Sequence, residues 1–487
     1  MVENYFKTAL FHHSKGNWNK AKEIYEHILK SNPNNLSVLQ NYGTVLSQLR
    51  EYKLAENIFK KCLKISPSDP LLLYNYGKLF HEQGIFDKAI KYYKDSFKFN
   101  PKNDISLYNI GNIFLFQNKF HDAINYFTKV IKTNSSNYMA YNNIAIAYKR
   151  IGDLDRALKF YREAIKINKD YVDAHVNYST ILLTKNKLDE GFEEYEWRKK
   201  SKSFVDFINY GSLKIQSQIW NGQNLNKKKL LIIAEQGIGD LIQFARYLYY
   251  LKKNYKVKII LKIKSKNFLH FFNDDFDIIS DQKEIPEHDY HNFMMSLPGV
   301  FFKTNNLFIK SFNFFEFNKK IQTFWGNKLK NISGVKVGIH WSTSSLMPER
   351  DLPLNYFNKL SKNIDASFIV LQKEVNKEET KILNQNKKIY YFPKMDQNQK
   401  AFLDSIEIIR KLDLIITSDT ALAHLAATLE KKTWIALPKI ADWRWFDNQK
   451  NTNWYQNVTL FRQLKIDDWD SVFKNITKKF NSEFKKN

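Results

Sequence analysis

Residues 235–240, EQGIGD, place a carboxylate behind a glycine-containing turn, between the apolar run 230–234 and a helix-like segment. Gly237 and Gly239 permit a tight turn and the close approach of a ligand. Asp240 stands at the helix start, where the helix dipole stabilises an ionised base. The stretch is neither a dinucleotide fingerprint, because Ile242 takes the third glycine position, nor a Walker loop. An ordinary capping aspartate is the alternative for Asp240.

Residues 418–424, SDTALAH, open a second helix-like segment directly after the apolar run 412–417. Thr420 and His424 are four residues apart and share one helical face. The free N–H groups of a helix start, a hydroxyl and an imidazole together suit a diphosphate, and the small Ala421 leaves room for it. Taken alone, the stretch could also be a capped helix in the core.

Both stretches belong to a pattern of short apolar runs that alternate with helix-like segments. One series begins at residues 230–234, and a second begins at KVGIHWS (336–342) and ends at TWIALP (433–438). Such runs predict two parallel sheets, each covered by helices on both faces, in two Rossmann-like lobes. Ligands of these sheets bind at the carboxyl ends of the strands, where EQGIGD and SDTALAH stand.

Taken together, these stretches resemble glycosyltransferase family nine, the heptosyltransferase family. The similar segments include EQGIGDLIQFARYL, MSLPGVF, KVGIHWS, RDLPL, SDTALAHLAATLEKKTWIALP and DWRWF, in one order over residues 216–475. The resemblance implies a GT-B fold of two facing lobes. It also implies inverting transfer of a hexosyl or heptosyl group from a nucleotide-diphosphate sugar, with no metal and no cofactor other than this co-substrate.

The resemblance implies a role for each matching polar residue. Asp240 would be the base that deprotonates the acceptor hydroxyl. The other residues would hold the donor: its nucleotide and diphosphate would contact Asp419, Thr420, Ala421 and His424, its phosphate Ser342 and Thr343, and its base or ribose Gln372 and Lys373. A base on one side of the anomeric carbon and charge stabilisation of the departing diphosphate on the other are what inverting transfer requires.

Arginine is scarce in this lysine-rich chain, so each arginine indicates a position that requires a planar guanidinium group with several hydrogen-bond donors. Arg350 and Arg444 lie in the segments PERDLPL and DWRWF, and we expect them to contact phosphate or sugar. A structural ion pair is the alternative for each. Arg246 is expected to be a structural partner on its helix. The tryptophans near residue 444 could stack on a sugar, although aromatic runs are more often core.

The first two hundred residues have a 34-residue period. Alanines recur at 21, 55, 89, 123 and 157, an aromatic residue follows each four positions later, and a second column holds Gly43, Gly77 and Gly111. Small residues at helical spacing let two helices approach closely while the aromatic residue fills the gap. This pattern resembles the tetratricopeptide repeat, with five units and a divergent sixth, and predicts an α-solenoid.

One column of the repeats is asparagine throughout and falls on the first helix of each predicted pair. Its members are Asn41, Asn75, Asn109, Asn143 and Asn177. That helix lines the concave face of such an array, and an amide both donates and accepts, so the column predicts binding of a peptide or glycan acceptor. Bridging between repeats, in a chain rich in asparagine, is the alternative.

The composition restricts the remaining classes of function. The net charge is +26 over 487 residues, but it is spread evenly along the chain, which favours a solvated basic surface over a nucleic-acid footprint. The single cysteine, Cys62, permits no intrachain disulfide and fits a reducing compartment. The start lacks a signal-peptide pattern, and no apolar run approaches the roughly 18 residues of a spanning helix, so we expect a cytoplasmic protein without a transmembrane segment.

These observations divide the chain into a repeat array (1–200), a linker (201–225), a first lobe on the acceptor side (226–325) and a second lobe on the nucleotide-sugar side (326–487). The expected fold is an α-solenoid followed by a GT-B pair of Rossmann-like lobes. The expected function is glycosyl transfer from a nucleotide sugar to a protein or glycan held by the repeats. The alternative is a protein-binding scaffold whose transferase-like domain is not catalytic.

Overall fold

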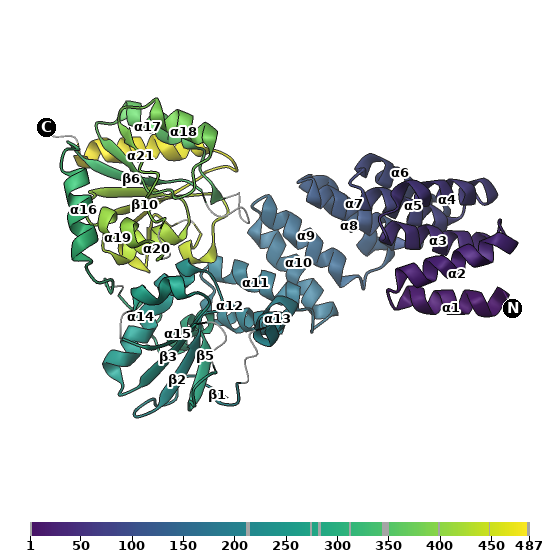
Figure 1. The fold of residues 1–487 in the computed structure, drawn as a ribbon, viewed down its shortest axis with the longest axis horizontal. Helices are drawn as coiled ribbons and strands as arrows, with labels where there is room; N and C mark the ends of the chain where they lie inside the picture. Colours follow the sequence, from purple (N-terminus) through teal and green to yellow (C-terminus); the bar gives the residue numbers. More distant parts are fainter. Residues whose placement is uncertain are drawn as a thin grey trace. The chain divides into compact units, whose positions relative to one another are not determined.

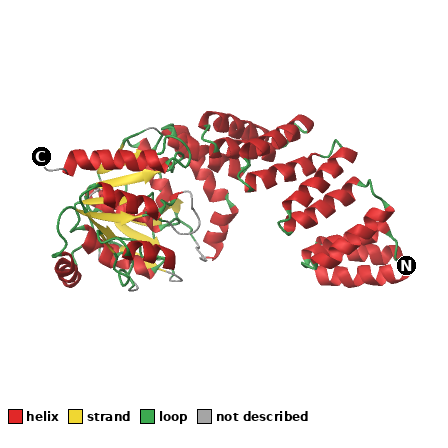
Figure 2. Cartoon of the chain, turned by 90° about the horizontal axis from the view of Figure 1, so that it is seen from above, coloured by secondary structure: helices red, strands yellow, loops and turns green. Residues whose placement is uncertain are grey.

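The computed structural model describes residues 2–210, 215–272, 275–280, 284–310, 313–342, 350–397, 400–447 and 449–484. The chain divides into two compact units, Met1–Ala174 and His175–Asn487. Each unit is described by itself. Helices build the described part of the first unit, and every strand of the described chain lies in the second (Figure 2).

The first unit is a stack of antiparallel helix pairs (Figure 1). Its helices are α1 (Val2–Ser14), α2 (Trp18–Ser31), α3 (Leu36–Gln48), α4 (Tyr52–Ile65), α5 (Pro70–Glu82), α6 (Phe86–Phe99), α7 (Asp104–Phe116), α8 (Phe120–Thr133), α9 (Tyr138–Arg150) and α10 (Leu154–Ile167). The 34-residue period therefore corresponds to one helix pair, and the predicted solenoid is confirmed.

The two columns of small residues sit where the helices of a pair meet. Ala123 on α8 is fully buried, and Gly111 on α7 lies against the ring of Phe127 on α8. A Cβ built on Gly111 would be 2.6 Å from Cε1 of that ring. Glycine is therefore needed because the aromatic ring occupies the space that a side chain would take.

The sixth repeat pair belongs to the second unit. It consists of α11 (Val172–Thr184), whose greater part lies beyond Ala174, and α12 (Leu188–Tyr195), which the 3-10 helix η1 (Glu196–Lys200) extends. Phe192 is 5% exposed and contacts the ring of Trp443, and its Cβ would be 3.2 Å from a Cβ on Gly299. This boundary differs from the predicted one at residue 200, because the last repeat buries its apolar face against the two lobes.

The segment predicted as a linker, residues 201–225, also contains secondary structure. Helix α13 (Lys202–Tyr210) packs Phe204 on Phe293, and β1 (Gln218–Ile219) joins the first sheet. Apolar residues of the segment cover one face of that sheet, and for this reason it is part of the first lobe.

The first lobe is a parallel sheet with strand order β1-β5-β2-β3-β4. Its other strands and its helices are β2 (Lys229–Ile233), α14 (Ile238–Asn254), β3 (Lys258–Ile263), η2 (Lys266–Phe271), β4 (Asp277–Ser280), β5 (Tyr290–Phe293), η3 (Met294–Ser296) and α15 (Leu297–Lys303). After β2 the chain runs to β3 on one side, and β5 returns on the other. The sheet therefore has a switch point between β2 and β5, and a crevice is expected at their carboxyl ends.

The second lobe is a sheet with order β11-β12-β10-β9-β6-β7-β8, in which only β11 is antiparallel among the described strands. Its elements are α16 (Lys319–Leu329), β6 (Lys336–His340), α17 (Leu354–Asn363), β7 (Ser367–Val370), α18 (Lys377–Asn384), β8 (Ile389–Tyr390), α19 (Leu403–Ile409), β9 (Leu414–Thr417), α20 (Ala421–Thr428), β10 (Thr433–Leu437), η5 (Trp443–Trp445), β11 (Asn451–Thr452), β12 (Tyr455–Arg462) and α21 (Trp469–Phe484). The switch point lies between β6 and β9.

The boundary between the lobes precedes α16, earlier than the predicted residue 326. Trp325 of α16 donates from Nε1 to Asp404 of the second lobe at 2.7 Å, and the backbone N–H of Asn318 donates to Glu407 at 3.1 Å. Because this helix packs on α19, it belongs with the second sheet.

Candidate functional site

The glycine turn after β2 brings Asp240 to the start of α14. Gly237 caps the helix, and its N–H donates to Oδ2 of Asp240 at 3.2 Å. The Asp240 side chain is 19% exposed. A half-buried carboxylate in the first turn of a helix benefits from the positive end of the helix dipole.

Gly239 lets the two lobes meet. A Cβ at this position would lie 3.3 Å from Cα of Ala421 and 3.3 Å from Cδ2 of His424, both in the first turns of α20. The start of α14 in the first lobe therefore lies against the start of α20 in the second. The structure thus brings the two stretches together at Gly239, and the predicted approach of a ligand to this turn stays a prediction.

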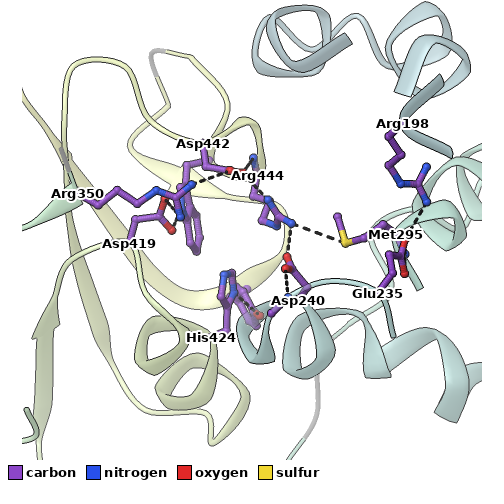
Figure 3. A network of polar contacts seen from close by, with 12 residues as sticks. Arg198, Glu235, Asp240, Met295, Arg350, Asp419, His424, Asp442 and Arg444 are labelled. Atoms are coloured by element: carbon purple, nitrogen blue, oxygen red, sulfur yellow. Dashed lines mark hydrogen bonds and ion pairs between the residues drawn. The ribbon is translucent and has the colours of Figure 1, made fainter. Parts of the chain in front are cut away.

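A chain of alternating charges crosses from one lobe to the other (Figure 3). Asp240 is paired with Nη2 of Arg444, whose Nη1 donates to Asp442 at 2.7 Å. Arg350 donates to the second oxygen of Asp442 at 3.1 Å and lies 3.4 Å from Oδ2 of Asp419. Two guanidinium groups therefore stand among three carboxylates at the crevice.

The charges of this chain are set by burial and by their neighbours. Burial alone would raise the pKa of Asp442, but Arg444 and Arg350 outweigh it and lower the pKa to about 2. Burial raises the pKa of Asp419, and Arg350 opposes this only in part. Asp442 is therefore a permanent anion between the two arginines.

The start of α20 has the features of an anion site. Thr420 is the N-cap residue, and its hydroxyl makes no capping bond. The hydroxyl of Ser418 is buried without a hydrogen-bond partner among the described residues. The first N–H groups of a helix have no intrahelical acceptors, so an oxyanion placed here would meet free donors.

His424 lies one turn further into α20. It is 4% exposed, stacks on Trp445 at 5.2 Å between ring centroids, and has Nδ1 3.1 Å from the hydroxyl of Tyr455. Burial lowers its pKa well below the usual value, and the charge of Arg444 lowers it further. The imidazole is therefore neutral near pH 7 and offers a neutral polar group rather than a cation.

Gln372, expected from the resemblance to lie beside a base or ribose, contacts the loop after β6 in the structure, and its role towards a ligand stays a prediction. Its amide is 7% exposed, accepts from the N–H of Ser342 at 3.2 Å and donates to the Ser342 hydroxyl at 3.1 Å. Gln372 thus holds the loop after β6. Lys373 is exposed after β7, and Thr343 lies outside the described residues.

Arg246 has the structural role expected of it. It is 2% exposed, donates from Nε to the carbonyl of Gln243 at 2.7 Å, and donates from Nη1 to the carbonyls of Trp454 at 2.6 Å and Ile309 at 3.2 Å. The tryptophans at 443, 445 and 454 are at most 4% exposed and belong to the core.

Sequence reasoning missed several residues of the site. They are Arg198, Glu235, Met295, His340 and Asp442. Asp442 is the first residue of DWRWF and Glu235 is the first residue of EQGIGD, so each belongs to a segment already named in the sequence. Arg198 had a signal as well, because arginine is scarce in this chain and Arg198 is one of the few arginines in the repeats.

The asparagine column lies on the first helices of the repeat pairs, as predicted. Asn109 donates to the hydroxyl of Tyr74 at 3.1 Å, and Asn143 donates to the hydroxyl of Tyr108 at 3.1 Å. Asn41 donates to the carbonyl of Ser37 within its own helix at 2.8 Å. Two members of the column therefore bridge successive repeats. Asn75 is half-buried, and Asn177 belongs to the second unit.

Within the described ranges, no group of three or more histidine, cysteine, aspartate or glutamate side chains is arranged to hold a metal ion. None of the helices described is long and apolar enough to cross a membrane. Cys62 is buried and free.

A repeat solenoid joined to two parallel-sheet lobes with facing crevices is consistent with a GT-B arrangement. Residues 3–35, 36–69, 71–103 and 108–172 match tetratricopeptide repeat families, and residues 317–437 match glycosyltransferase family 9 (heptosyltransferase). The chain therefore carries tetratricopeptide repeats at its N-terminus and a glycosyltransferase family 9 domain at its C-terminus. Asp240 and Arg444 lie outside the matched residues.

The similar proteins cover only parts of this chain. "Protein FlbA" of Caulobacter vibrioides is 40% identical over 70 residues, which are 14% of this chain and 11% of the length of that relative. Among solved structures, the MamA protein has a TM-score of 0.31 at 21% identity and covers 35% of this chain and 92% of its own. Pseudomonas aeruginosa pilF has a TM-score of 0.37 at 18% identity, over 43% of this chain and 97% of its own.

Proposed function

We propose that the second unit is an inverting, metal-independent glycosyltransferase that moves a sugar from a nucleotide-diphosphate sugar to a protein or glycan acceptor held by the repeats. The observation that carries the proposal is the meeting of Asp240, at the start of α14, with Arg444 and the start of α20. A carboxylate and an anion site thus face each other across the crevice between the lobes.

The donor side is the start of α20. The free N–H groups there and the hydroxyls of Ser418 and Thr420 would hold the diphosphate, and Arg350 and Arg444 would supply positive charge. As the bond from the anomeric carbon to the diphosphate oxygen breaks, its electron pair moves to that oxygen. Preorganised donors and cations stabilise this developing charge.

The acceptor side is Asp240. Its carboxylate would take the proton of the acceptor hydroxyl while the acceptor oxygen forms a bond to the anomeric carbon on the face opposite the diphosphate, which inverts that centre. This carboxylate is paired with the guanidinium group of Arg444. Binding of the diphosphate would compete with Asp240 for this guanidinium group and so free the base.

The decisive experiment replaces Asp240 by asparagine, which keeps the size of the side chain but removes its basicity. We expect kcat for sugar transfer to fall by about 10²–10⁴-fold, the usual contribution of a general base. The affinity for a nucleoside diphosphate, measured by calorimetry, should not fall, since the donor site lies on the other lobe and asparagine no longer competes with the diphosphate for Arg444.

The matched control is Asp277→Asn, which removes a carboxylate of the same lobe that is 53% exposed and pairs with Lys258 at 2.8 Å. It should leave kcat unchanged. Undiminished turnover of Asp240→Asn contradicts the assignment of the base. If the wild-type protein binds no nucleoside diphosphate even at millimolar concentration, the scaffold function replaces the transferase.

A further inference from the structure

Arg198 is a buried cation at the end of the sixth repeat. It lies in η1 (Glu196–Lys200), which continues directly from α12, and its side chain is 7% exposed. Nη1 donates to Oε1 of Glu196 at 2.8 Å, and Nη2 donates to Oε1 of Glu235 at 2.9 Å and to the hydroxyl of Ser296 at 2.8 Å. The guanidinium group thus joins its own segment, η1, to two others, at Glu235 and at Ser296.

Glu235 is the partner that matters for the site. It is the first residue of EQGIGD, five positions before Asp240, and its side chain is 2% exposed. Its carboxylate also accepts the backbone N–H of Met295 at 3.3 Å. Glu235 is therefore fixed at both switch-point strands, β2 and β5, and Arg198 is the charge that balances it.

A second set of contacts joins the surroundings of Arg198 and Glu235 to Asp240. The sulfur of Met295 lies 3.8 Å from Nη2 of Arg444, the nitrogen that pairs with Asp240 (Figure 3). Met295 is next to Ser296, which Arg198 binds, so the segment held by Arg198 contacts the Asp240–Arg444 pair. A shift of this segment would displace the carboxylate and its partner together.

We propose that Arg198 is a positioning residue, through which the sixth repeat holds the loop of residues 235–240 so that Asp240 keeps its place at the crevice. The inference rests on the proposed function for its consequence in catalysis. A buried guanidinium that donates from both Nη atoms fixes geometry as well as charge, because its donors form a rigid planar fork.

The test uses the full-length protein and Arg198→Met, Arg198→Lys and the double variant Arg198→Met with Glu235→Gln. Arg410→Met is the matched control, since Arg410 also pairs with a buried glutamate, Glu407, at 2.8 Å, with side chains 8% and 1% exposed. This pair lies on and beside α19, away from the crevice residues named above. The readouts are hydrogen exchange of residues 236–241, kcat, and nucleoside-diphosphate affinity.

In Arg198→Met we expect the amides of residues 236–241 to exchange at least about tenfold faster than in the wild type and in Arg410→Met, because the loop opens locally. We expect kcat to fall by about 10–100-fold while nucleoside-diphosphate affinity stays within about twofold, since small displacements of a reacting group slow the chemical step. Arg198→Lys should recover part of kcat, because it keeps the charge but not the fork.

The double variant separates positioning from charge balance. Glutamine removes the uncompensated buried charge, so folding stability should recover while exchange stays fast and kcat stays low. Full recovery of kcat in the double variant, or exchange in Arg198→Met no faster than in Arg410→Met, overturns the inference. If the wild-type protein transfers no sugar, the proposed function fails, and the exchange data alone still decide the positioning role.

Discussion

Asp442 lies between two guanidinium groups, and His424 and His340 lie in surroundings that disfavour a charge. At the scale of single residues, the site therefore keeps its positive charge on arginine and its imidazoles neutral. An arginine retains its charge at every accessible pH, whereas a buried histidine loses its charge near neutrality. A site that binds a diphosphate with arginine is consequently insensitive to pH on its cationic side.

His340, at the end of β6, gives a prediction on pH. Burial lowers its pKa to about 4, and its Nδ1 lies 3.5 Å from the hydroxyl of Thr420. The unfolded chain binds a proton at this histidine below about pH 6.5 while the folded protein does not. Stability is therefore fully present above about pH 6.5 and falls as the pH drops, with a loss from this group of about 2 kcal/mol at about pH 5 and about 3 kcal/mol at about pH 4.

The measurement is the free energy of unfolding of the second unit in urea at about pH 7 and about pH 5. His340→Gln should lose less stability over this interval than the wild type. An equal loss in His340→Gln and the wild type would contradict the prediction.

At the scale of elements, the distance between two helices is set by a few small residues. The glycine column of the repeats faces aromatic rings, and Gly239 faces α20 in the same way. The column was visible in the sequence because it repeats every 34 residues. The contact of Gly239 with Ala421 was not visible, since it joins elements about 180 residues apart, and no local pattern records such a pair.

Gly111→Ala tests this packing in the repeats. Its Cβ would lie 2.6 Å from the ring of Phe127, so we expect the first unit to lose about 1–3 kcal/mol of unfolding free energy from overpacking. The loss should appear even though alanine favours a helix over glycine by about 1 kcal/mol. Urea unfolding followed by circular dichroism measures it.

Two further variants give the control. Gly326→Ala on α16 places a Cβ with nothing within 4 Å, so it should gain about 0.5–1 kcal/mol from helix propensity alone. Phe127→Leu added to Gly111→Ala should recover part of the loss by making room. A Gly111→Ala protein as stable as the wild type would show that the ring moves aside freely.

At the scale of the whole molecule, the boundary between the two compact units falls inside the repeat array. The sixth pair buries Leu183, Phe192 and Tyr195 in the core shared by the two lobes. The backbone N–H of Asp447 also donates to the carbonyl of Thr184 at 2.8 Å. The sixth repeat is therefore part of the second unit, which also holds the two lobes.

This division predicts different outcomes for two truncated proteins. A fragment of residues 169–487, which keeps α11 complete, should fold and unfold cooperatively. A fragment of residues 201–487 should aggregate, because it lacks the three core side chains of the sixth repeat, which uncovers the apolar surface of the lobes that they bury, and because it leaves Glu235 without Arg198. The combined cost is about 5–10 kcal/mol. That is comparable to the stability of a typical domain.

Size-exclusion chromatography and thermal unfolding of the two fragments measure this difference. If residues 201–487 prove as monomeric and as stable as residues 169–487, the boundary at residue 200 is the correct one. Nucleoside-diphosphate binding by the longer fragment would show, in addition, that the donor site does not need the first five repeat pairs.

The sequence by itself determined the elements, the repeat, the two parallel sheets and the two glycine- and hydroxyl-bearing turns, because periodicity and strand-end chemistry are local properties of the chain. Only the tertiary structure decided that Asp240 pairs with Arg444, that Gln372 holds the loop after β6, and that Arg198 holds Glu235. These contacts join residues 30 to 204 positions apart. Such pairs depend on how the lobes and the last repeat bury their apolar faces together, and no short-range pattern encodes that packing.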